Sequence, residues 1–505
     1  MVDPQHPDAL VLSIDQGTSS TKVLLVDRAG QVVARAVRTL GLSSPQPGWI
    51  EQDAIEIFEC TVAAIAEAID GLADRIVAIG LSSQRESAVI WDRHTGEPLG
   101  PVLGWQDRRT ASAARHLESD GHGALVREAT GLPIDAMFSA LKFAWQLDQV
   151  DPDRRRSEAG ELALGTVDSW LVFRLTGQHR IEVGNASRTQ LLNLEAAMWD
   201  DRLLELFRIP RAALPTVVSS VEPSGPITAI AGLPDDVRIH AVLGDSHAAL
   251  FGHGVRAPGA VKVTYGTGSS IMGLTSPAGV EGSGMVRTIA WSLGEPVSAF
   301  EGNILSSGST LVWLGDLLGL TVDALMVLAE NVDDSGGVVM VPAFAGLGAP
   351  WWDDRARAVI IGIDQSTTTA HLARAAAESI AHQVDDVLAA ADLAMGGRVD
   401  TILADGGPSA NLWLMQVQAD LSQRRVEPSA TAELSALGAA YLAGTTVGMW
   451  TDDEVRAFAS VSKREVEPEL DPSLAHDRRV AWLDAVRLAM SPSHPSTTLL
   501  DHLVS

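Results

Sequence analysis

A polar run near the N-terminus combines residue types that bind phosphate. Asp15 ends an apolar segment, Gly17-Thr18-Ser19-Ser20 follows it, and Lys22 opens the next apolar segment. A tight turn of glycine, serine and threonine between two strands exposes backbone N–H groups and hydroxyls, which suit phosphate oxygens. Lys22 adds a positive charge, and Asp15 could hold a metal ion through water. The run lacks the spacing of a Walker loop, so a plain polar hairpin turn remains the alternative.

A second acid follows an apolar segment in the middle of the chain. Asp245 comes directly after Val242-Leu243-Gly244 and before a stretch, Ser246 to Phe251, that we expect to be helical. Open α/β sheets place their sites at the carboxyl ends of strands, which makes Asp245 a candidate general base. The alternative is that Asp245 only caps the helix that follows it.

Two further groups could recognise hydroxyls. Gln84-Arg85-Glu86 follows the apolar segment Ile76 to Leu81 and combines donors with acceptors. Trp105 stands in a polar run, Trp105 to Arg109, where its ring could pack on the carbon face of a sugar. The alternatives are a solvated, salt-bridged turn for the first group and ordinary core packing for the tryptophan.

A glycine-rich turn lies in the C-terminal half. An apolar segment ends in Asp405-Gly406-Gly407, and a helix is expected from about Ser409, close to Asn411. Glycines let a ligand approach the backbone, and a helix N-terminus favours anions. The alternative is a plain strand-to-helix turn capped by Ser409. The sequence has neither the H-E-x-x-H spacing of a metalloprotease nor a G-x-S-x-G nucleophile elbow.

These residues need elements to position them, and the pattern predicts α/β layering. Short apolar segments such as Ala9 to Ile14 alternate with helical stretches such as Ile55 to Ile69. A second strand–turn–strand pattern surrounds Gly266-Thr267-Gly268-Ser269-Ser270, about half a chain length after the first polar turn. The shared context indicates an internal duplication, with a domain boundary near residues 250–257.

Composition narrows the classes of partner. The chain has 505 residues and a formal net charge of −27, which repels nucleic acid and anionic lipid, so we expect neither nucleic-acid binding nor membrane insertion. Cys60 is the single cysteine, which suits a reducing compartment. No apolar stretch approaches the ~18 residues of a membrane span, and the N-terminus does not read as a signal peptide. We expect a cytoplasmic protein.

Taken together, these strings resemble the FGGY carbohydrate kinases, of the actin/hexokinase-like superfamily, and among them most closely the glycerol kinases. The resemblance covers about residues 10 to 450. Its motifs include Ile14-Asp15-Gln16-Gly17-Thr18, Gln84-Arg85-Glu86, Trp105-Gln106-Asp107-Arg108-Arg109, Asn185-Ala186-Ser187-Arg188-Thr189, Tyr265-Gly266-Thr267-Gly268 and Asp405-Gly406-Gly407.

The resemblance implies an α/β fold of two duplicated RNase H-like domains with an interdomain cleft. We expect a polyol- or sugar-binding N-terminal domain with the first phosphate hairpin over residues 8–252. A nucleotide-binding C-terminal domain would follow over 258–450. A helical tail, 451–505, would pack on the C-terminal domain.

The resemblance also implies a nucleotide site for ATP and Mg²⁺. Asp15 matches the acid that holds Mg²⁺ through water. Lys22 stands where an arginine is usual, and Val312 replaces a usual glutamine, so one nucleotide hydrogen bond is expected to be absent. The positions that match nucleotide contacts are Thr18, Ser19, Ser20, Lys22, Thr267, Gly308, Gly407 and Asn411.

On the acceptor side, Arg85, Glu86 and Asp245 match hydroxyl-binding residues, Trp105 matches an aromatic wall, and Asp245 would be the general base. Three positions depart from the glycerol kinase pattern. Met137 replaces a tyrosine, Ser246 a glutamine and Ser270 a phenylalanine, which predicts a larger and differently polar pocket.

The expected activity is transfer of the γ-phosphate of ATP to a terminal hydroxyl of a small polyol or sugar, with glycerol as the first choice. A longer C4–C5 polyol or ketose stays open because of the three changed positions. A non-enzymatic actin-like ATP-binding protein is the third reading. Members of this family often form homo-oligomers, and we expect one here.

Overall fold

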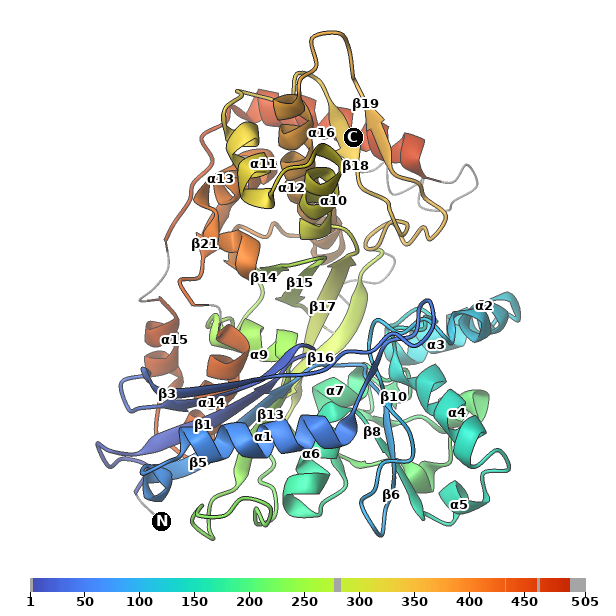
Figure 1. Ribbon diagram of the computed structural model, residues 1–505, viewed down its shortest axis with the longest axis vertical. Coiled ribbons are helices and arrows are strands. Elements are labelled where there is room, and N and C mark those ends of the chain that lie inside the picture. The colour runs from blue at the N-terminus through green and yellow to red at the C-terminus, as the bar shows by residue number, and fades with distance from the viewer. Residues whose placement is uncertain (1–2, 277–282, 432, 461–463, 491–505) are drawn as a thin grey trace. The chain divides into compact units, whose positions relative to one another are not determined.

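The computed structural model describes residues 3–276, 283–431, 433–460 and 464–490 (Figure 1). The chain folds into two compact units. The first unit comprises Met1–Gly254, Arg287–Ser298 and Glu433–Ser460. The second comprises Val255–Val286, Ala299–Ala432 and Val461–Ser505. We describe each unit by itself.

The first unit is built on a five-stranded sheet in the order β13-β5-β1-β2-β3. Its strands are β1 (Leu10–Gln16), β2 (Ser20–Val26), β3 (Val32–Thr39), β5 (Ile76–Ser83) and β13 (Ile239–Gly244). The strands β1, β2 and β3 form an antiparallel meander, whereas β5 pairs in parallel with both β1 and β13. The polar run at Gly17 is therefore the β1–β2 turn, as the sequence predicts, with Gly17 N–H donating to the Ser20 carbonyl at 3.0 Å.

Helices cover both faces of this sheet. Apolar residues of α1 (Ala54–Ala68) and α6 (Val167–Thr176) pack with those of β1, β2 and β5 in one core. Figure 1 shows α1 running along the sheet. On the other face lies α14 (Leu434–Thr446), which comes so close that a Cβ at Gly80 would sit 2.2 Å from the Ala439 carbonyl oxygen. The helix α9 (Asp245–Gly252) packs against α14 through small residues, Gly252 and Gly438.

The rest of the first unit consists of short strands and helices around a second core. They are β4 (Glu51–Gln52), β6 (Val89–Asp92), β7 (Val102–Leu103), β8 (Leu162–Gly165), β9 (Arg180–Glu182), β10 (Leu192–Asn193), β11 (Met198–Trp199), β12 (Thr216–Val218), α2 (Ala111–Ser119), α3 (Gly123–Thr130), α4 (Ser139–Val150), α5 (Arg155–Glu158), α7 (Val183–Ser187) and α8 (Asp201–Phe207). The helix α15 (Asp452–Ser460) instead packs beside α14, where Phe458 contacts Tyr441.

The sheet of the second unit repeats the plan of the first. Its strands follow the order β17-β15-β14-β20-β21, with β14 (Ala260–Tyr265), β15 (Ser269–Leu274), β17 (Pro296–Ile304), β20 (Thr401–Asp405) and β21 (Arg425–Pro428). The strand β16 (Val286–Ser292) consists almost entirely of residues that belong to the first unit. The strands β14, β15 and β17 are antiparallel, and β20 pairs in parallel with β14 and β21. Because strand order and direction match those of β1, β2, β3, β5 and β13, the two sheets support the expected duplication.

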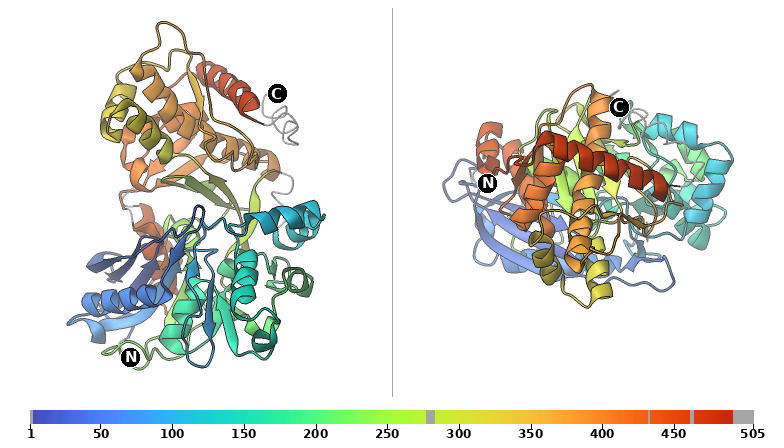
Figure 2. Two further views of the ribbon diagram at one scale, coloured as in Figure 1. Left: turned by 45° about the vertical axis from the view of Figure 1, so that its right-hand side comes forward. Right: turned by 90° about the horizontal axis from the view of Figure 1, so that it is seen from above.

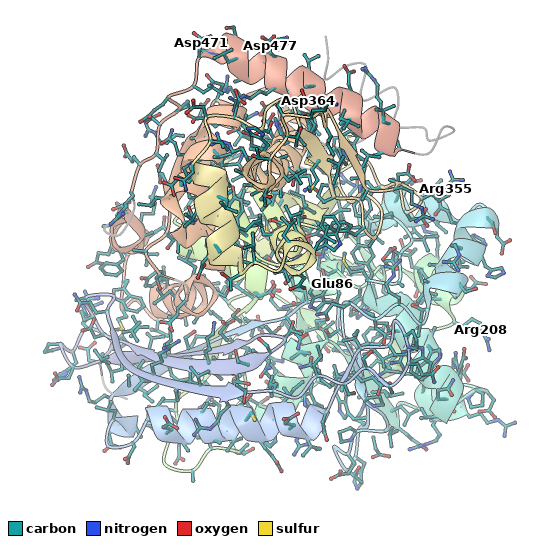
Figure 3. All side chains as sticks on the ribbon, turned by 45° about the horizontal axis from the view of Figure 1, so that its top comes forward. Glu86, Arg208, Arg355, Asp364, Asp471 and Asp477 are labelled. Atoms are coloured by element: carbon teal, nitrogen blue, oxygen red, sulfur yellow. The ribbon has the colours of Figure 1, made fainter. Side chains whose placement is uncertain are left out.

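A long helix, α12 (Thr369–Met395), packs with α13 (Leu412–Ser422) against β14, β15 and β17 in the core of this unit. The helices α10 (Gly308–Leu318) and α11 (Val322–Glu330) add to the same core, and β18 (Val339–Val341) pairs with β19 (Val359–Ile361). Figure 2 shows α16 (Pro472–Ala489) lying across the end of the unit. Arg479 of α16 is ion-paired with Asp386 of α12, and Figure 3 labels Asp471 and Asp477 near the start of α16.

The structure divides the C-terminal part differently from our expectation. The helices α14 and α15, within residues 433–460, group with the first unit, whereas the family resemblance predicts a C-terminal domain over 258–450 and a tail over 451–505. The physical reason is the close packing of α14 on the first sheet. Of the tail, α16 does belong to the second unit, and residues 491–505 lie outside the described part.

Among the described residues, no single helix is both long and apolar enough to cross a membrane. The helices α10 and α11 meet such a test only as a pair, and they are bent by 96° relative to each other.

Candidate active site

Four residues with charged side chains lie at the carboxyl ends of three strands, at the same edge of the first sheet. Because β1, β5 and β13 run in parallel, their carboxyl ends meet at one edge. Asp15 is near the end of β1, Arg85 and Glu86 follow β5, and Asp245 follows β13. We call these four residues the strand-end cluster; Glu86 is labelled in Figure 3.

Within the strand-end cluster, Arg85 and Asp245 are directly bonded. Arg85 Nε donates to Asp245 Oδ1 at 3.1 Å. The Arg85 side chain is only 7% exposed and that of Asp245 39%, so the guanidinium fixes a carboxylate that is still open to solvent. Gly244 makes this possible, because a Cβ there would sit 2.5 Å from Arg85 Cδ.

The role of Asp245 as a helix cap is not what the structure shows. Gly244 is the N-cap of α9 and Asp245 is its first residue, and the Asp245 carboxylate accepts from the adjacent Ser246 N–H at 2.6 Å. A carboxylate held in place by an arginine and partly open to solvent can accept a proton from a bound hydroxyl.

The side chain of Glu86 is buried and tightly held. Its Oε1 accepts from Arg188 Nε at 2.6 Å, and Arg85 Nη1 lies 4.0 Å away. The Glu86 backbone has a φ of 61°, in the left-handed region. Such conformations persist where the surroundings enforce them, and they cluster at functional sites.

Asp15 has the properties of a residue that binds a hydrated cation. It is buried, Ser82 Oγ donates to its Oδ1 at 2.9 Å, and Lys22 Nζ lies 4.0 Å from its Oδ2. Burial raises the pKa of Asp15 to about 6, although Lys22 and Ser82 act in the opposite direction. The described residues contain no group of three or more His, Cys, Asp or Glu side chains that could hold a metal. Mg²⁺ typically needs only one or two carboxylates together with waters and substrate phosphates, so a single buried Asp15 fits it.

The β1–β2 turn and Trp105 are in contact. Trp105 Nε1 donates to Thr18 Oγ1 at 3.1 Å, and Gln52 Nε2 donates to the Thr18 carbonyl at 2.8 Å. Ser19 is exposed, and Ser20 is half-buried at the start of β2. These contacts hold Thr18 in place, while the hydroxyls of Ser19 and Ser20 and the exposed Trp105 ring remain available to a ligand.

A large cavity lies in the second unit, and we call it the second-unit cavity. Its volume is about 1070 Å³, and it brings together all four nucleotide-matching residues of this unit, Thr267, Gly308, Gly407 and Asn411. Apolar side chains line it as well, among them Leu311, Val312, Trp313, Met326 and Leu414. The lining suits a flat heterocyclic ligand with a polar end.

Backbone hydrogen bonds shape the mouth of this cavity. Gly308 N–H donates to the Gly266 carbonyl at 2.8 Å, and Ser307 N–H to the Thr267 carbonyl at 2.9 Å. A Cβ at Gly308 would lie 2.6 Å from the Gly266 carbonyl oxygen. Asn411, rather than Ser409, caps the helix α13, since its Oδ1 accepts from Leu414 N–H at 3.0 Å.

The three positions that depart from the family pattern fall into different units. Met137 and Ser246 are half-buried in the first unit, and Met137 N–H donates to Asp135 Oδ1 at 2.8 Å. Ser270 belongs to the second unit, where its hydroxyl donates to the buried Glu301 at 3.3 Å.

Sequence reasoning missed two residues beside the strand-end cluster. Arg188 and Lys142 are fully buried, and both bond to Glu86. For Arg188 a signal was present, because it lies in one of the strings that resemble the family. Lys142 lies among apolar residues of α4, and a lone lysine in such a helix does not reveal its partner.

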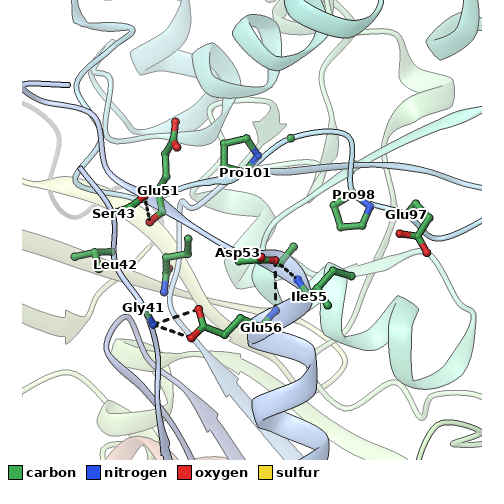
Figure 4. Close-up of a pocket in the computed structure, with 13 residues that line it drawn as sticks. Gly41, Leu42, Ser43, Glu51, Asp53, Ile55, Glu56, Glu97, Pro98 and Pro101 are labelled. Atoms are coloured by element: carbon green, nitrogen blue, oxygen red, sulfur yellow. Dashed lines mark hydrogen bonds between the residues drawn. The ribbon is translucent and has the colours of Figure 1, made fainter. Parts of the chain in front are cut away.

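A groove on the first unit carries no site of its own (Figure 4). Four acids line it, and three of them have a structural task. Glu56 accepts from Gly41 N–H, Asp53 caps α1, and Glu51 is paired with Arg109 at 2.7 Å.

The chain is similar to known proteins along almost its whole length. Residues 10–252 match the N-terminal domain, and residues 261–447 the C-terminal domain, of the FGGY family of carbohydrate kinases. A glycerol kinase of Geobacter sp. strain M21 is 45% identical over 491 residues, covering 95% of this chain and 98% of its own length. A glycerol kinase of Aromatoleum aromaticum is 45% identical over 493 residues, with the same coverage.

A solved structure is similar along almost the whole chain. The glycerol kinase of Plasmodium falciparum with ADP has a TM-score of 0.90 and 30% identity, covering 96% of this chain and 98% of that one. The fold is therefore the two-domain, actin/hexokinase-like fold of these kinases, and the family implies ATP as the phosphate donor. The chain belongs to the FGGY family of carbohydrate kinases.

Proposed function

We propose that the chain transfers the γ-phosphate of ATP to a terminal hydroxyl of glycerol, giving glycerol 3-phosphate and ADP. The observation that carries the proposal is the Arg85–Asp245 pair at the strand ends, with Glu86 beside it and Trp105 near the β1–β2 turn. Glycerol as the acceptor is supported by the similarity of this chain to two proteins named glycerol kinases, which covers nearly their whole length.

In this proposal the strand-end cluster binds the acceptor. Glu86 and Arg85 form hydrogen bonds with hydroxyls of the polyol, and the Trp105 ring packs on its carbon face. As the terminal oxygen attacks the γ-phosphorus, Asp245 accepts the proton from that hydroxyl. The bond from the γ-phosphorus to the β,γ-bridging oxygen breaks, and ADP leaves with the electron pair. Arg85 keeps the Asp245 carboxylate aimed at the acceptor throughout.

The donor nucleotide would bind in the second-unit cavity. Thr267, Gly308, Gly407 and Asn411 would contact it there, while Thr18, Ser19, Ser20 and Lys22 of the β1–β2 turn would bind its phosphates. Asp15 would hold Mg²⁺ through water, and that ion supplies charge neutralisation for the phosphates. The N-terminal residues 8–252 would thus serve the acceptor and 258–450 chiefly the nucleotide.

A second candidate is a kinase for a longer C4–C5 polyol or ketose. Met137 offers no hydroxyl and Ser246 no amide, so fewer polar partners remain for a small triol in the first unit. A site that loses such partners leaves hydroxyls unpaired at about 1–3 kcal/mol each. This loss favours an acceptor whose extra hydroxyls reach other groups.

The test is ADP release coupled to NADH oxidation, with ATP and Mg²⁺ and a panel of glycerol, erythritol, threitol, ribitol, xylitol, xylulose and ribulose. The highest kcat/KM for glycerol supports the first proposal. A longer acceptor that wins by about tenfold or more, a difference of 1.4 kcal/mol in transition-state binding, supports the second. ATP use that does not depend on any acceptor would support the actin-like reading and contradict both.

We also propose a homo-oligomer in the cytoplasm. Its support is the family resemblance and the single cysteine, Cys60, which suits a reducing compartment. Light scattering after size-exclusion chromatography measures the mass; a value near the 53.3 kDa of one chain contradicts the oligomer.

A further inference from the structure

Glu86 needs support because its backbone is strained. A φ of 61° is uncommon for a residue with a side chain, and glutamate lacks the short polar side chain whose local hydrogen bond lets asparagine adopt it. The strain is kept only where neighbouring groups hold the backbone. The position matters because Arg85, the residue before Glu86, carries the bond to Asp245.

The Glu86 residue is held at both ends. Its carboxylate accepts from Arg188 Nε at 2.6 Å. Its carbonyl accepts from two donors of α4, Ser139 Oγ at 3.0 Å and Lys142 Nζ at 3.1 Å. The two carbonyl contacts fix the direction of the peptide group that follows Glu86, and therefore the ψ angle of Glu86, while the carboxylate contact fixes its side chain.

Lys142 makes a second contact that joins two parts of the proposed acceptor site. Its Nζ also donates to the Met137 carbonyl at 2.6 Å, and the residue has no exposed surface. A buried ammonium is costly unless it is hydrogen-bonded, so both carbonyls are strongly preferred partners. One ammonium thus ties the Glu86 loop to Met137, one of the three residues that depart from the family pattern.

We propose that Lys142 is a positioning residue that sets the acceptor site by holding the Glu86 and Met137 carbonyls in a fixed relation. The proposal rests on the proposed function, because it needs the acceptor to bind at the strand-end cluster. Without Lys142 the Glu86 carbonyl keeps Ser139 as a donor but loses its tie to the Met137 carbonyl, so its strained backbone is held less firmly and Arg85 and Glu86 are less well aligned. The acceptor then binds more weakly, whereas the second-unit cavity keeps all its contacts.

The protonation of Lys142 allows a second, independent test of this role by varying the pH. The charged groups that act on Lys142 are Glu86, Asp107, Asp135 and Arg108. Burial lowers the pKa of Lys142 to about 7, although the three carboxylates oppose that shift. A neutral amine is a weaker hydrogen-bond donor than an ammonium. The hydrogen bonds from Lys142 to the two carbonyls therefore weaken as the pH rises past the pKa of Lys142.

The experiment replaces the ammonium by an apolar group of similar length, Lys142→Met. The control is Lys262→Met, the same change at a lysine of β14 in the second unit that is also fully buried. For each protein, KM for the best acceptor of the panel, KM for ATP and kcat are measured at pH 7. We expect Lys142→Met to raise the acceptor KM about tenfold or more and to change the ATP KM by less than about twofold. Lys262→Met leaves the acceptor KM within about twofold.

An acceptor KM within about twofold of wild type in Lys142→Met, or an equal rise in Lys262→Met, overturns the proposal. If Lys142→Met does not fold, the wild-type pH profile decides. The acceptor KM should rise between pH 7 and 9 while the ATP KM stays level, and a level acceptor KM overturns the proposal. Failure of the proposed function looks different, because the wild-type protein then shows no acceptor-dependent ADP release.

Discussion

In the first unit, Arg85 of the strand-end cluster is a buried charged side chain that contacts both Asp245 and Glu86. The second-unit cavity is instead lined by glycines, apolar side chains and backbone. Arg85, Glu86 and Arg188 form a continuous set of ionic contacts. The mouth of the cavity is instead shaped by the Gly266 and Thr267 carbonyls. The comparison shows that ion pairs orient the side chains of the strand-end cluster, whereas the shape of the backbone forms the second-unit cavity.

Each kind of site should therefore fail in its own way. Removing a charge from the strand-end cluster should harm proton transfer, acceptor binding or stability. Adding bulk to the backbone of the cavity should harm nucleotide binding. A change of the same type outside the site concerned should leave the affinity of that site nearly unchanged.

The largest effect is expected from Asp245→Asn. An amide keeps the shape of the side chain but does not accept the acceptor's proton, so kcat should fall about 10³-fold or more. The measurement is kcat at saturating ATP and acceptor, with the melting temperature as a check on folding. Retention of more than about a tenth of wild-type kcat in a folded variant would show that Asp245 is not the base.

A large loss of stability is expected from Arg188→Met. The change leaves the buried Glu86 carboxylate without its 2.6 Å partner, and Arg85 at 4.0 Å is too far to replace it. Breaking a buried pair on one side costs about 3–5 kcal/mol in the free energy of unfolding. Urea denaturation measures it.

The matched control for that variant is Arg374→Met in the second unit. Its partner Glu378 keeps a second arginine, Arg478, at 3.2 Å, so the carboxylate stays paired and the loss should be clearly smaller. Equal losses in the free energy of unfolding for the two variants would mean that the Arg188–Glu86 pair contributes no more to stability than the Arg374–Glu378 pair.

On the side of the second-unit cavity, Gly308→Ala should raise the ATP KM about tenfold, a loss of 1.4 kcal/mol. Its Cβ would meet the Gly266 carbonyl oxygen at 2.6 Å and push apart the two turns that shape the mouth of the cavity. Gly397→Ala is the control, because nothing lies within 4 Å of a Cβ there. A rise in the acceptor KM rather than the ATP KM would reverse the assignment of the two sites.

The dependence of stability on pH offers a smaller effect. The pKa of Lys142 is about 7 when folded, against 10.5 in its ordinary state. Between these values the unfolded chain binds one more proton at this site, so this lysine makes stability rise with pH by up to about 1.4 kcal/mol per unit. Subtracting the urea stability of Lys142→Met from that of wild type at pH 8 and pH 9 isolates the slope. A difference that does not change with pH would show that Lys142 keeps its proton in the folded protein and that burial does not lower its pKa.

Much of the first site could be predicted from sequence because it depends on strand ends. Asp15, Arg85 and Asp245 each follow an apolar segment, and parallel pairing brings such ends together whatever the intervening sequence. The duplicated sheet plan was predictable for a similar reason, since Gly17-Thr18 and Gly266-Thr267 mark equivalent turns.

The contacts that join distant segments could not be predicted. Lys142 meets Glu86 only because α4 packs beside the end of β5, and nothing in its own neighbourhood indicates this. The helix α14 follows the second unit in the chain but packs on the first sheet, where Gly80 lets the Ala439 backbone approach. Close approaches of this kind depend on pairs of small residues far apart in sequence.

The smallest effect should come from the wall of the second-unit cavity. Val312 is 51% exposed on α10 and lines the cavity at a position where the family pattern has glutamine. Val312→Gln should lower the ATP KM about threefold, because one added hydrogen bond contributes about 0.5–1.5 kcal/mol. Leu317→Gln, a similar change at an exposed residue of α10 that does not line the cavity, should leave the ATP KM unchanged. If Val312→Gln instead weakens ATP binding, the nucleotide lies against this wall through apolar contact alone, and the contrast between a charged site and an apolar one is sharper than the family pattern implies.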